Sequence, residues 1–406
     1  MKNHPGTNKW YVLVLAALTG ALAITAPSAS LAVLFSEISN DLHLSLVQMG
    51  LLWSIGSLPA IFTSPLSGAV IDRFGPRRVM LFATISVGLV AGMRGLAADF
   101  ASFFWIVILI GVLVPLITMS AFKISSILFP PRQLGLANGI FSMGMGFGFL
   151  LGSLLSATVI SPWLGGWRNV MFFYGAIAAL LCIPWYFTRS LPGPAGSGSA
   201  ETEIGSMRAS LTQIVKLKNV WLLGVTVMGI NGCVQGLLGY LSLYLRGLGW
   251  TGASADGALS LLSIMSMIFV LPLALGSDRL FARKKILLAM ILMIAVGTGL
   301  LSVGSVLLVW GAVIMIGMVR DGSMAVLMTM VIETDGVGPV YAGTASGFVM
   351  FFLFAGNLLA PPIGNRLAEI SPGLAFIFWS GLAFLGVASL TFVKSSRAAR
   401  LAPEAR

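Results

Sequence analysis

The sequence predicts an all-α membrane protein with twelve transmembrane helices in two parallel six-helix repeats. Four observations support this fold class. The chain is too apolar for a soluble protein, since 57% of its residues are hydrophobic, only 9% are charged and the mean hydropathy is +0.98. Several uncharged runs exceed the roughly 20 residues that cross a bilayer as a helix. Sequence motifs also recur in the two halves, and the apolar runs lack the alternation of polar and apolar residues that barrel strands require.

The apolar runs predict twelve spans. No charged residue interrupts residues 10–36 or 286–319. The second run is too long for one helix, so we expect a turn at Gly304 and Ser305. The first run also resembles a cleavable signal peptide, but apolar character resumes at Leu31, so we expect an uncleaved span. The twelve spans are expected to begin near Tyr11, Val47, Val79, Phe103, Leu136, Val170, Trp221, Ala258, Ile286, Leu307, Ala345 and Leu374.

The positions of Lys and Arg predict the orientation of the chain in the membrane. If the N-terminus is cytoplasmic, eighteen of the 24 basic residues lie at the cytoplasmic side and four at the opposite side. We therefore expect a multi-pass protein of the inner (plasma) membrane with both termini in the cytoplasm. The net charge of +11 then reflects topology, and because the cations are scattered over short loops we expect no nucleic-acid partner. The two cysteines and two histidines form no cluster, so neither a metal nor another cofactor is expected.

A charged loop, GAVIDRFGPRRVM at residues 68–80, recurs in the second half. Aligning Asp72 with Asp278 places Arg73 over Arg279, Arg77 over Arg283 and Arg78 over Lys284. Gly148 likewise matches Gly356, and GLANG at 135–139 matches GTASG at 343–347, with offsets between 206 and 211 residues. We expect six-helix bundles at 1–188 and 219–394, a Gly-, Ser- and Pro-rich cytoplasmic linker at 189–218 and a cytoplasmic tail at 395–406.

On these residues the chain resembles the major facilitator superfamily over nearly its full length. The family's loop signature reads Gly, three residues, Asp-Arg, one residue, Gly, one residue, Arg, then Arg or Lys, and it is complete from Gly68 to Arg78. The second copy has Ala274 and Phe281 in place of the two glycines. The resemblance implies alternating access, in which the halves rock about a substrate site near the membrane midplane. It also implies that spans one, four, seven and ten line the cavity.

We expect the charged loops to form a conformational gate. Asp72 ends span two, where a cation or a helix end can hold it, and Lys123 is a candidate partner. Glu333 and Asp335 follow span ten and can pair with Arg279 or Arg283. The alternative is that the arginines only fix topology. The predicted gating residues are Asp72, Arg73, Gly75, Arg77, Asp278, Arg279, Arg283 and Glu333.

Four polar side chains inside the predicted spans are the candidate substrate-binding residues. A charge at the centre of a membrane helix costs about 2.5 to 3.5 kcal/mol on insertion scales. Arg320 and Asp321 nevertheless lie about thirteen residues into span ten, roughly 20 Å along it. Successive residues diverge by about 100° around a helix, so the two need not pair with each other. Asn231 and Gln235 share one face of span seven. The alternatives are a structural ion-pair network for the charged residues and helix-to-helix hydrogen bonds for the amides.

A mid-membrane arginine suits a carboxylate, which it can bind through two hydrogen bonds. The segments FPPRQLGLANG and GGWRNVMFFYG resemble the bacterial nitrate, cyanate and monocarboxylate relatives, although the arginines typical of nitrate porters are missing from spans two and eight. We expect a monomeric secondary transporter in the lipid bilayer that moves a small organic anion, with proton coupling through Asp321 as an option.

Two other functional classes stay open. One is an exporter of amphipathic or cationic compounds, with Asp321 binding the substrate; span five lacks the Gly-Pro signature of proton-coupled drug antiporters. The other is a membrane sensor or scaffold that retains the fold. The spans contain no nucleophile–base pair or metal cluster, which argues against an enzyme.

Overall fold

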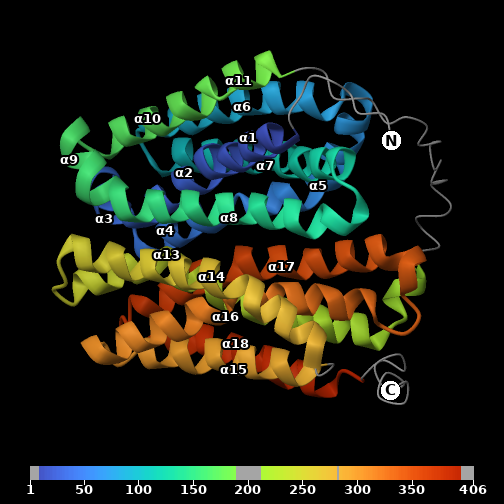
Figure 1. Ribbon diagram of the computed structural model, residues 1–406. Helices are drawn as coiled ribbons and strands as arrows, with labels where there is room; N and C mark the ends of the chain where they lie inside the picture. Colours follow the sequence, from blue (N-terminus) through green and yellow to red (C-terminus); the bar gives the residue numbers. More distant parts are fainter. Residues whose placement is uncertain (1–8, 189–211, 281–282, 395–406) are drawn as a thin grey trace. The chain divides into compact units, whose positions relative to one another are not determined.

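The computed structural model describes residues 9–188, 212–280 and 283–394. Helices without any strand make up the secondary structure of these ranges (Figure 1), and twelve of them are long and apolar enough to cross a membrane. Each of the twelve begins within about six residues of the expected start, so the predicted fold class is confirmed. The expected turn at Gly304 is also confirmed, since one helix ends at Leu301, the next begins at Val306, and Gly304 adopts a φ of +70° between them.

The first six spans are built from eleven α-helices and three short irregular turns. They are α1 (Lys9–Thr19), the π-helical turn η1 (Gly20–Thr25), α2 (Ala26–Val33), α3 (Phe35–Leu42), α4 (Leu46–Ser54), α5 (Ser57–Phe74), α6 (Pro76–Met93), the 3-10 turn η2 (Arg94–Leu96), α7 (Phe100–Leu128), α8 (Pro131–Leu155), the π-helical turn η3 (Ser156–Ile160), α9 (Ser161–Leu164), α10 (Trp167–Leu180) and α11 (Cys182–Phe187).

The last six spans are longer, less interrupted helices. They are α13 (Lys218–Gly247), α14 (Gly252–Leu280), α15 (Arg283–Leu301), α16 (Val306–Ile332), α17 (Gly338–Ala368) and α18 (Leu374–Phe392).

Contacts divide the chain into two compact units. Among the described residues, the first comprises 9–188 with Ser242–Ser263, and the second comprises 212–241 with 264–280 and 283–394. The adjoining ends of α13 and α14 therefore group with the first six spans. The predicted linker at 189–218 lies largely outside the described residues.

The same helix pairs pack together in both halves. In the first half α6 packs against α7 and α10, which places span three between spans four and six. In the second half α15 packs against α16 and α18, the corresponding pairs of spans nine, ten and twelve. This repeated packing supports the interpretation of the two halves as structural repeats.

Glycines bring the first and fifth spans of each half into backbone contact. A Cβ at Gly144 of α8 would lie 2.7 Å from the carbonyl oxygen of Ala17 in α1. A Cβ at Gly356 of α17 would lie 2.5 Å from the carbonyl oxygen of Met228 in α13. Since real Cβ atoms keep at least about 3 Å from such atoms, only glycine fits these positions. We call these two contact lines the glycine seams.

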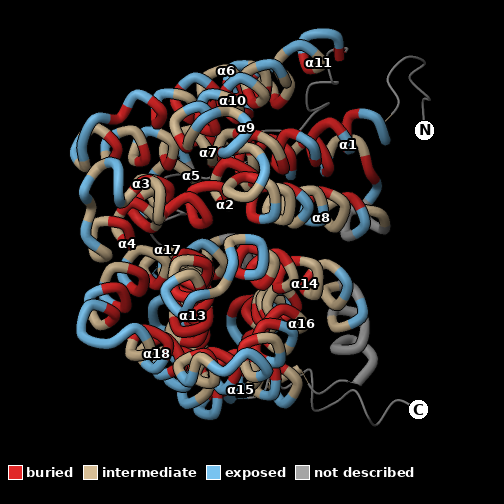
Figure 2. The backbone as a smooth tube through the Cα atoms, turned by 90° about the vertical axis from the view of Figure 1, so that its left-hand side faces the viewer, coloured by how far each residue is buried: buried red, intermediate tan, exposed pale blue. Residues whose placement is uncertain are grey.

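Large apolar side chains cover the outside of the helices. Phe82 is 67% exposed, and Leu89, Trp105 and Ile377 are exposed as well. Figure 2 shows the complementary pattern. The buried residues lie on the inner faces of the helices, where the helices of a bundle pack against one another. Because an exposed apolar surface of this extent is unfavourable in water, it fits a surface covered by lipid chains.

Candidate functional site

A cavity of about 220 Å³ lies between α13 and α16, the seventh and tenth spans. All four candidate substrate-binding residues line it, so the structure brings them together. Its lining is Ile230, Asn231, Val234, Gln235 and Leu238 of α13 with Arg320, Asp321, Ser323 and Met324 of α16. The lining therefore combines amide, hydroxyl and charged groups with apolar side chains, as small-molecule sites commonly do.

Arg320 and Asp321 form an ion pair with each other. The Nε of Arg320 lies 2.8 Å from Oδ1 of Asp321 and its Nη2 lies 3.1 Å from Oδ2, so the pair is held by two hydrogen bonds. Helix geometry does not require neighbours in sequence to pair, but the long guanidinium arm bridges the separation between them. Both charges are therefore compensated within the site.

The guanidinium of Arg320 keeps one nitrogen without a partner. Its Nη1 is buried and has no hydrogen-bond acceptor among the described residues. The side chain of Arg320 is only 14% exposed, whereas that of Asp321 is 44% exposed. A buried donor without an acceptor is costly, so an acceptor that reaches this nitrogen gains a strong, charge-assisted contact.

Asn231 and Gln235 share one face of α13 and line the same cavity, as their i, i+4 spacing predicted. Asn231 donates from Nδ2 to the carbonyl oxygen of Val227 at 3.2 Å, which fixes its amide against its own helix. Tyr240 points elsewhere and packs its ring against Phe376 and Trp379, with centroids 5.8 and 5.9 Å away. Ser323 was missed from sequence, although it lies one helical turn after Arg320; its Oγ donates to the Arg320 carbonyl at 2.7 Å.

The predicted gate in the first half is an ion pair between Asp72 and Lys123. The Nζ of Lys123 lies 3.1 Å from Oδ1 of Asp72, and the two side chains are 36% and 63% exposed. Such an exposed pair contributes only about 0 to 1 kcal/mol to stability. Gly75, with a φ of +83°, makes the turn between α5 and α6, and the guanidinium of Arg73 lies 5.4 Å from the ring centre of Phe74.

Arg77 has a structural contact that its gating assignment did not anticipate. Its Nη2 donates to the carbonyl oxygen of Tyr186 at 2.5 Å, and its Nε lies within 3.3 Å of the Trp185 carbonyl and the Thr188 hydroxyl. The three groups belong to the end of α11, where helical carbonyls lack intrahelical partners. Arg77 therefore caps the sixth span.

In the second half, Arg283 and Glu333 form the expected ion pair. The pair connects the start of α15 to the end of α16. The side chains of Asp278 and Arg279 lie outside the described residues, so their roles stay predictions.

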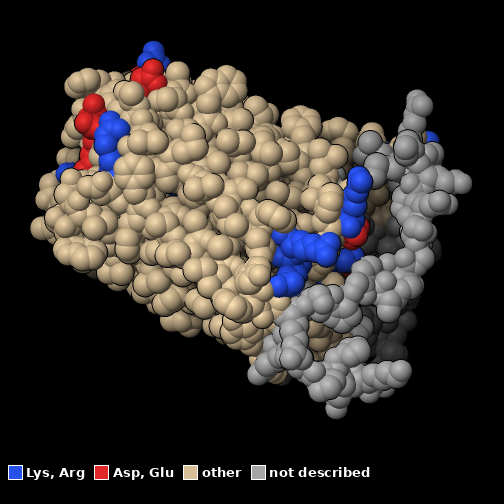
Figure 3. Space-filling model, turned by 90° about the horizontal axis from the view of Figure 1, so that it is seen from above, with Lys and Arg blue, Asp and Glu red and all other residues tan. Residues whose placement is uncertain are grey.

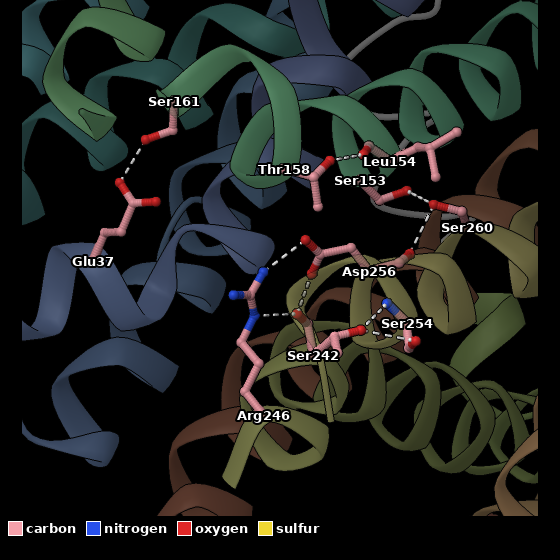
Figure 4. A network of polar contacts seen from close by, with 11 residues as sticks. Glu37, Ser153, Leu154, Thr158, Ser161, Ser242, Arg246, Ser254, Asp256 and Ser260 are labelled. Carbon is pink, nitrogen blue, oxygen red and sulfur yellow. Dashed lines mark hydrogen bonds and ion pairs between the residues drawn. The ribbon is translucent and has the colours of Figure 1, made fainter. Parts of the chain in front are cut away.

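A second charged cluster lies where α13 ends and α14 begins, within the first unit. Figure 4 shows Asp256 between Arg246 and Ser242, which contact its carboxylate at 2.6 and 2.5 Å. The Asp256 side chain is fully buried, and the neighbouring Ser260 places its Oγ 2.8 Å from Ser153 of α8. Sequence reasoning missed Asp256 because it placed the start of span eight at Ala258, whereas the span begins at Gly252.

The sequence profile of the Major Facilitator Superfamily matches residues 13–361 of the chain. The chain belongs to this superfamily. Its twelve spans, its charged loop after the second span and its repeated packing are thus those of a family of membrane transporters, and a small-molecule substrate is expected of it.

Two relatives match nearly the whole chain. The hexuronate transporter of Bacillus subtilis (strain 168) is 25% identical, and the match covers 92% of this chain and 90% of the relative's own length. The 3-(3-hydroxy-phenyl)propionate transporter of Escherichia coli (strain K12) is 24% identical, over 90% and 89%. The multidrug resistance protein MdtG of Klebsiella pneumoniae (strain 342) is 30% identical, but over only 49% of this chain and 47% of its own length.

Solved structures of transporters share the fold. The nucleoside transporter NupG covers 95% of this chain with all of its own length, at a TM-score of 0.78 and 14% identity. A bacterial homolog of the human lysosomal transporter Spinster covers 96% of this chain with 95% of its own, at a TM-score of 0.73 and 19% identity. These identities are low, so the likeness concerns the fold alone.

Proposed function

We propose that this superfamily member is a secondary transporter that moves a small organic anion, a carboxylate, by alternating access. Its substrate site is the cavity between α13 and α16. The observation that carries the proposal is the guanidinium of Arg320, which lines a cavity of about 220 Å³ and whose buried Nη1 has no acceptor among the described residues. A carboxylate oxygen is the acceptor that a guanidinium binds best.

The rest of the lining suits the remainder of such a substrate. The amides of Asn231 and Gln235 and the hydroxyl of Ser323 can bind hydroxyl groups, and Val234 and Leu238 can cover carbon atoms. The full-length relatives are named for hexuronate and 3-(3-hydroxy-phenyl)propionate, both of which are carboxylates. Both the cavity and the relatives therefore favour an organic acid.

Charge balance favours co-transport of a proton. The empty site holds one guanidinium and one carboxylate, so a bound anion would give it a net charge of −1. Burying an uncompensated charge is costly, and a proton on Asp321 would restore neutrality while freeing Nε and Nη2 of Arg320 for the substrate. Asp321 then binds the proton and Arg320 binds the anion, and the binding of each ligand favours the binding of the other.

A second function has one observation in its favour. Asp321 is the more accessible member of the pair, at 44% against 14% for Arg320. An exporter of cationic or amphipathic compounds would use Asp321 as the anionic group at the cavity and Arg320 as its structural partner.

Binding and counterflow in proteoliposomes test these functions. We expect glucuronate and 3-phenylpropionate to stabilise the purified protein against heat and to exchange across the vesicle membrane, and we expect lipophilic cations to do neither. Arg320→Gln should weaken carboxylate binding about ten- to a hundredfold, because a charged hydrogen bond contributes about 1.5 to 3 kcal/mol. Arg320→Lys should weaken binding less, since an ammonium keeps the charge and loses the planar two-point contact.

Two controls separate binding from folding. Arg366→Gln removes an arginine that is 75% exposed and pairs with Glu369 away from the cavity, so its binding should match the wild type. Arg320→Gln/Asp321→Asn removes both charges and should fold while failing to bind carboxylates. If the double variant transports carboxylates normally, the pair is structural and the carboxylate assignment to Arg320 is wrong. The substrate must then be sought along Asn231 and Gln235.

Asp321→Asn tests proton coupling. With a neutral side chain at 321, exchange of anion against anion should continue, whereas accumulation driven by an inward proton gradient should be lost. Gradient-driven accumulation by this variant at the wild-type level would refute coupling through Asp321.

A further inference from the structure

A second, apolar groove lies in the first half, formed by α5, α6 and α7. It holds about 260 Å³ and is lined by Val70 and Phe74 of α5, Arg78, Val79, Phe82, Ala83 and Ser86 of α6, and Leu116 of α7. Two of its lining side chains are not apolar, Arg78 and Ser86, the first and the last of the lining residues along α6. None of its residues belongs to the cavity between α13 and α16.

Arg78 differs in its contacts from two other charged residues of its loop, Asp72 and Arg77. Asp72 pairs with Lys123, and Arg77 caps α11. The guanidinium of Arg78 is exposed and forms no hydrogen bond or ion pair with any described residue. An arginine without a protein partner at the end of an apolar groove is positioned for an amphipathic anion.

The groove opens on the outer surface of the spans. Phe82 is 67% exposed and Phe74 is 52% exposed, so the groove is not enclosed by protein. In Figure 3 the charged side chains of the visible face are confined to its two ends, and the face between them is free of charge. Such a face is covered by acyl chains in a bilayer, with phosphates at the level of the charged ends.

The position of Arg78 along α6 and the charge around it indicate which kind of lipid headgroup fits the groove. Arg78 is the third residue of α6, so it lies in the first turn of that helix, whose free backbone N–H groups add partial positive charge. It also belongs to the loop that carries Arg73 and Arg77, at the membrane side where basic residues are most frequent. Basic pockets between transmembrane helices on that side bind anionic headgroups.

We propose that this groove binds one anionic phospholipid, with an acyl chain between α5, α6 and α7 and the phosphate on Arg78. The site is independent of the substrate cavity and of the transported molecule.

Native mass spectrometry of the purified protein, titrated with phosphatidylglycerol or with phosphatidylcholine of the same chains, tests the proposal. We expect about fivefold tighter binding of phosphatidylglycerol, the effect of roughly one basic group at a membrane surface. Arg78→Gln should remove this preference. Ser86→Phe, which fills the groove, should weaken both lipids.

Arg73→Gln is the matched control, because it removes an arginine from the same loop that does not itself line the groove, although its guanidinium lies 5.4 Å from the ring centre of Phe74. It should keep the preference within about twofold. Glycerol 3-phosphate should not displace the lipid, which distinguishes a lipid site from a site for free phosphate compounds. Equal preference in the wild type and Arg78→Gln, an equal loss in Arg73→Gln, or displacement by glycerol 3-phosphate would each overturn the proposal.

Discussion

The glycine seam of the second half predicts a large difference in stability between two glycine-to-alanine substitutions in α17. A Cβ at Gly356 would lie 2.5 Å from the carbonyl oxygen of Met228 and 3.2 Å from the nitrogen of Gly232, both backbone atoms of α13. Neither atom can move away without shifting the helix. A Cβ at Gly347, in the same helix, meets no atom within 4 Å.

The magnitudes follow from these distances. Overpacking a tight contact costs about 1 to 3 kcal/mol. Replacing a helical glycine by alanine gains about 0.5 to 1 kcal/mol where space allows. Gly356→Ala should therefore destabilise the protein by up to about 2.5 kcal/mol, whereas Gly347→Ala should leave it unchanged or more stable. In thermal unfolding, each kcal/mol shifts the midpoint by about 2 to 4 °C for a unit of 150 to 250 residues.

Unfolding in detergent, followed by tryptophan fluorescence, measures the difference. The first half supplies an independent repeat of the experiment, since Gly148 packs against the backbone at Ala21 and Gly139 of the same helix meets no atom within 4 Å. If Gly356→Ala and Gly148→Ala are as stable as Gly347→Ala and Gly139→Ala, the helices are not in backbone contact and the seams do not exist.

Three further predictions concern the charged loop and the topology. Arg77→Gln should lower the unfolding midpoint, because the end of α11 loses its cap at Tyr186, whereas Arg78→Gln should not; equal midpoints would remove the capping role. Asp72→Asn should slow transport while leaving substrate affinity within a few fold, and Lys123→Gln should do the same, because either change breaks the pair at 3.1 Å; an unchanged rate in folded Asp72→Asn protein would leave the motif a topology signal. In a background with Cys182 and Cys233 replaced by serine, single cysteines at His43 and Lys394 should be labelled by an impermeant maleimide from opposite sides of the membrane, and labelling from one side would contradict the twelve-span topology.

The spans could be predicted because hydropathy is a local property of the sequence. Length and the lack of charge located all twelve spans, and a glycine within an over-long run located the turn at Gly304. The charged loop was found because it recurs, and its recurrence placed Arg283 close enough to the end of span ten for a pair with Glu333.

Other contacts could not be predicted because they depend on which helices meet. Arg77 caps residues 108 or more positions later in the chain, a partner that the loop sequence does not specify. The depth of Arg320 and Asp321 was inferred from their position along span ten, but a helical wheel places neighbours on different faces, and only the reach of the guanidinium joins them. Asp256 was missed for a simpler reason: an error of six residues in one span boundary placed it outside the membrane.

The π-helical turn at Gly20–Thr25 has a consequence for how the two halves can be compared. Hydrogen bonds from i to i+5 fit one additional residue into a turn, so the first span contains an insertion without any loop. Its counterpart α13 is a continuous α-helix. The offset between matching residues falls from 211, for NKW at residues 8–10 against NVW at 219–221, to 206 at Asp72, and this turn accounts for about one of those residues. Two copies of one ancestral bundle can therefore differ in length inside a membrane helix, and an alignment of the halves that admits gaps only in loops will rotate part of the first span by about 100° relative to the seventh.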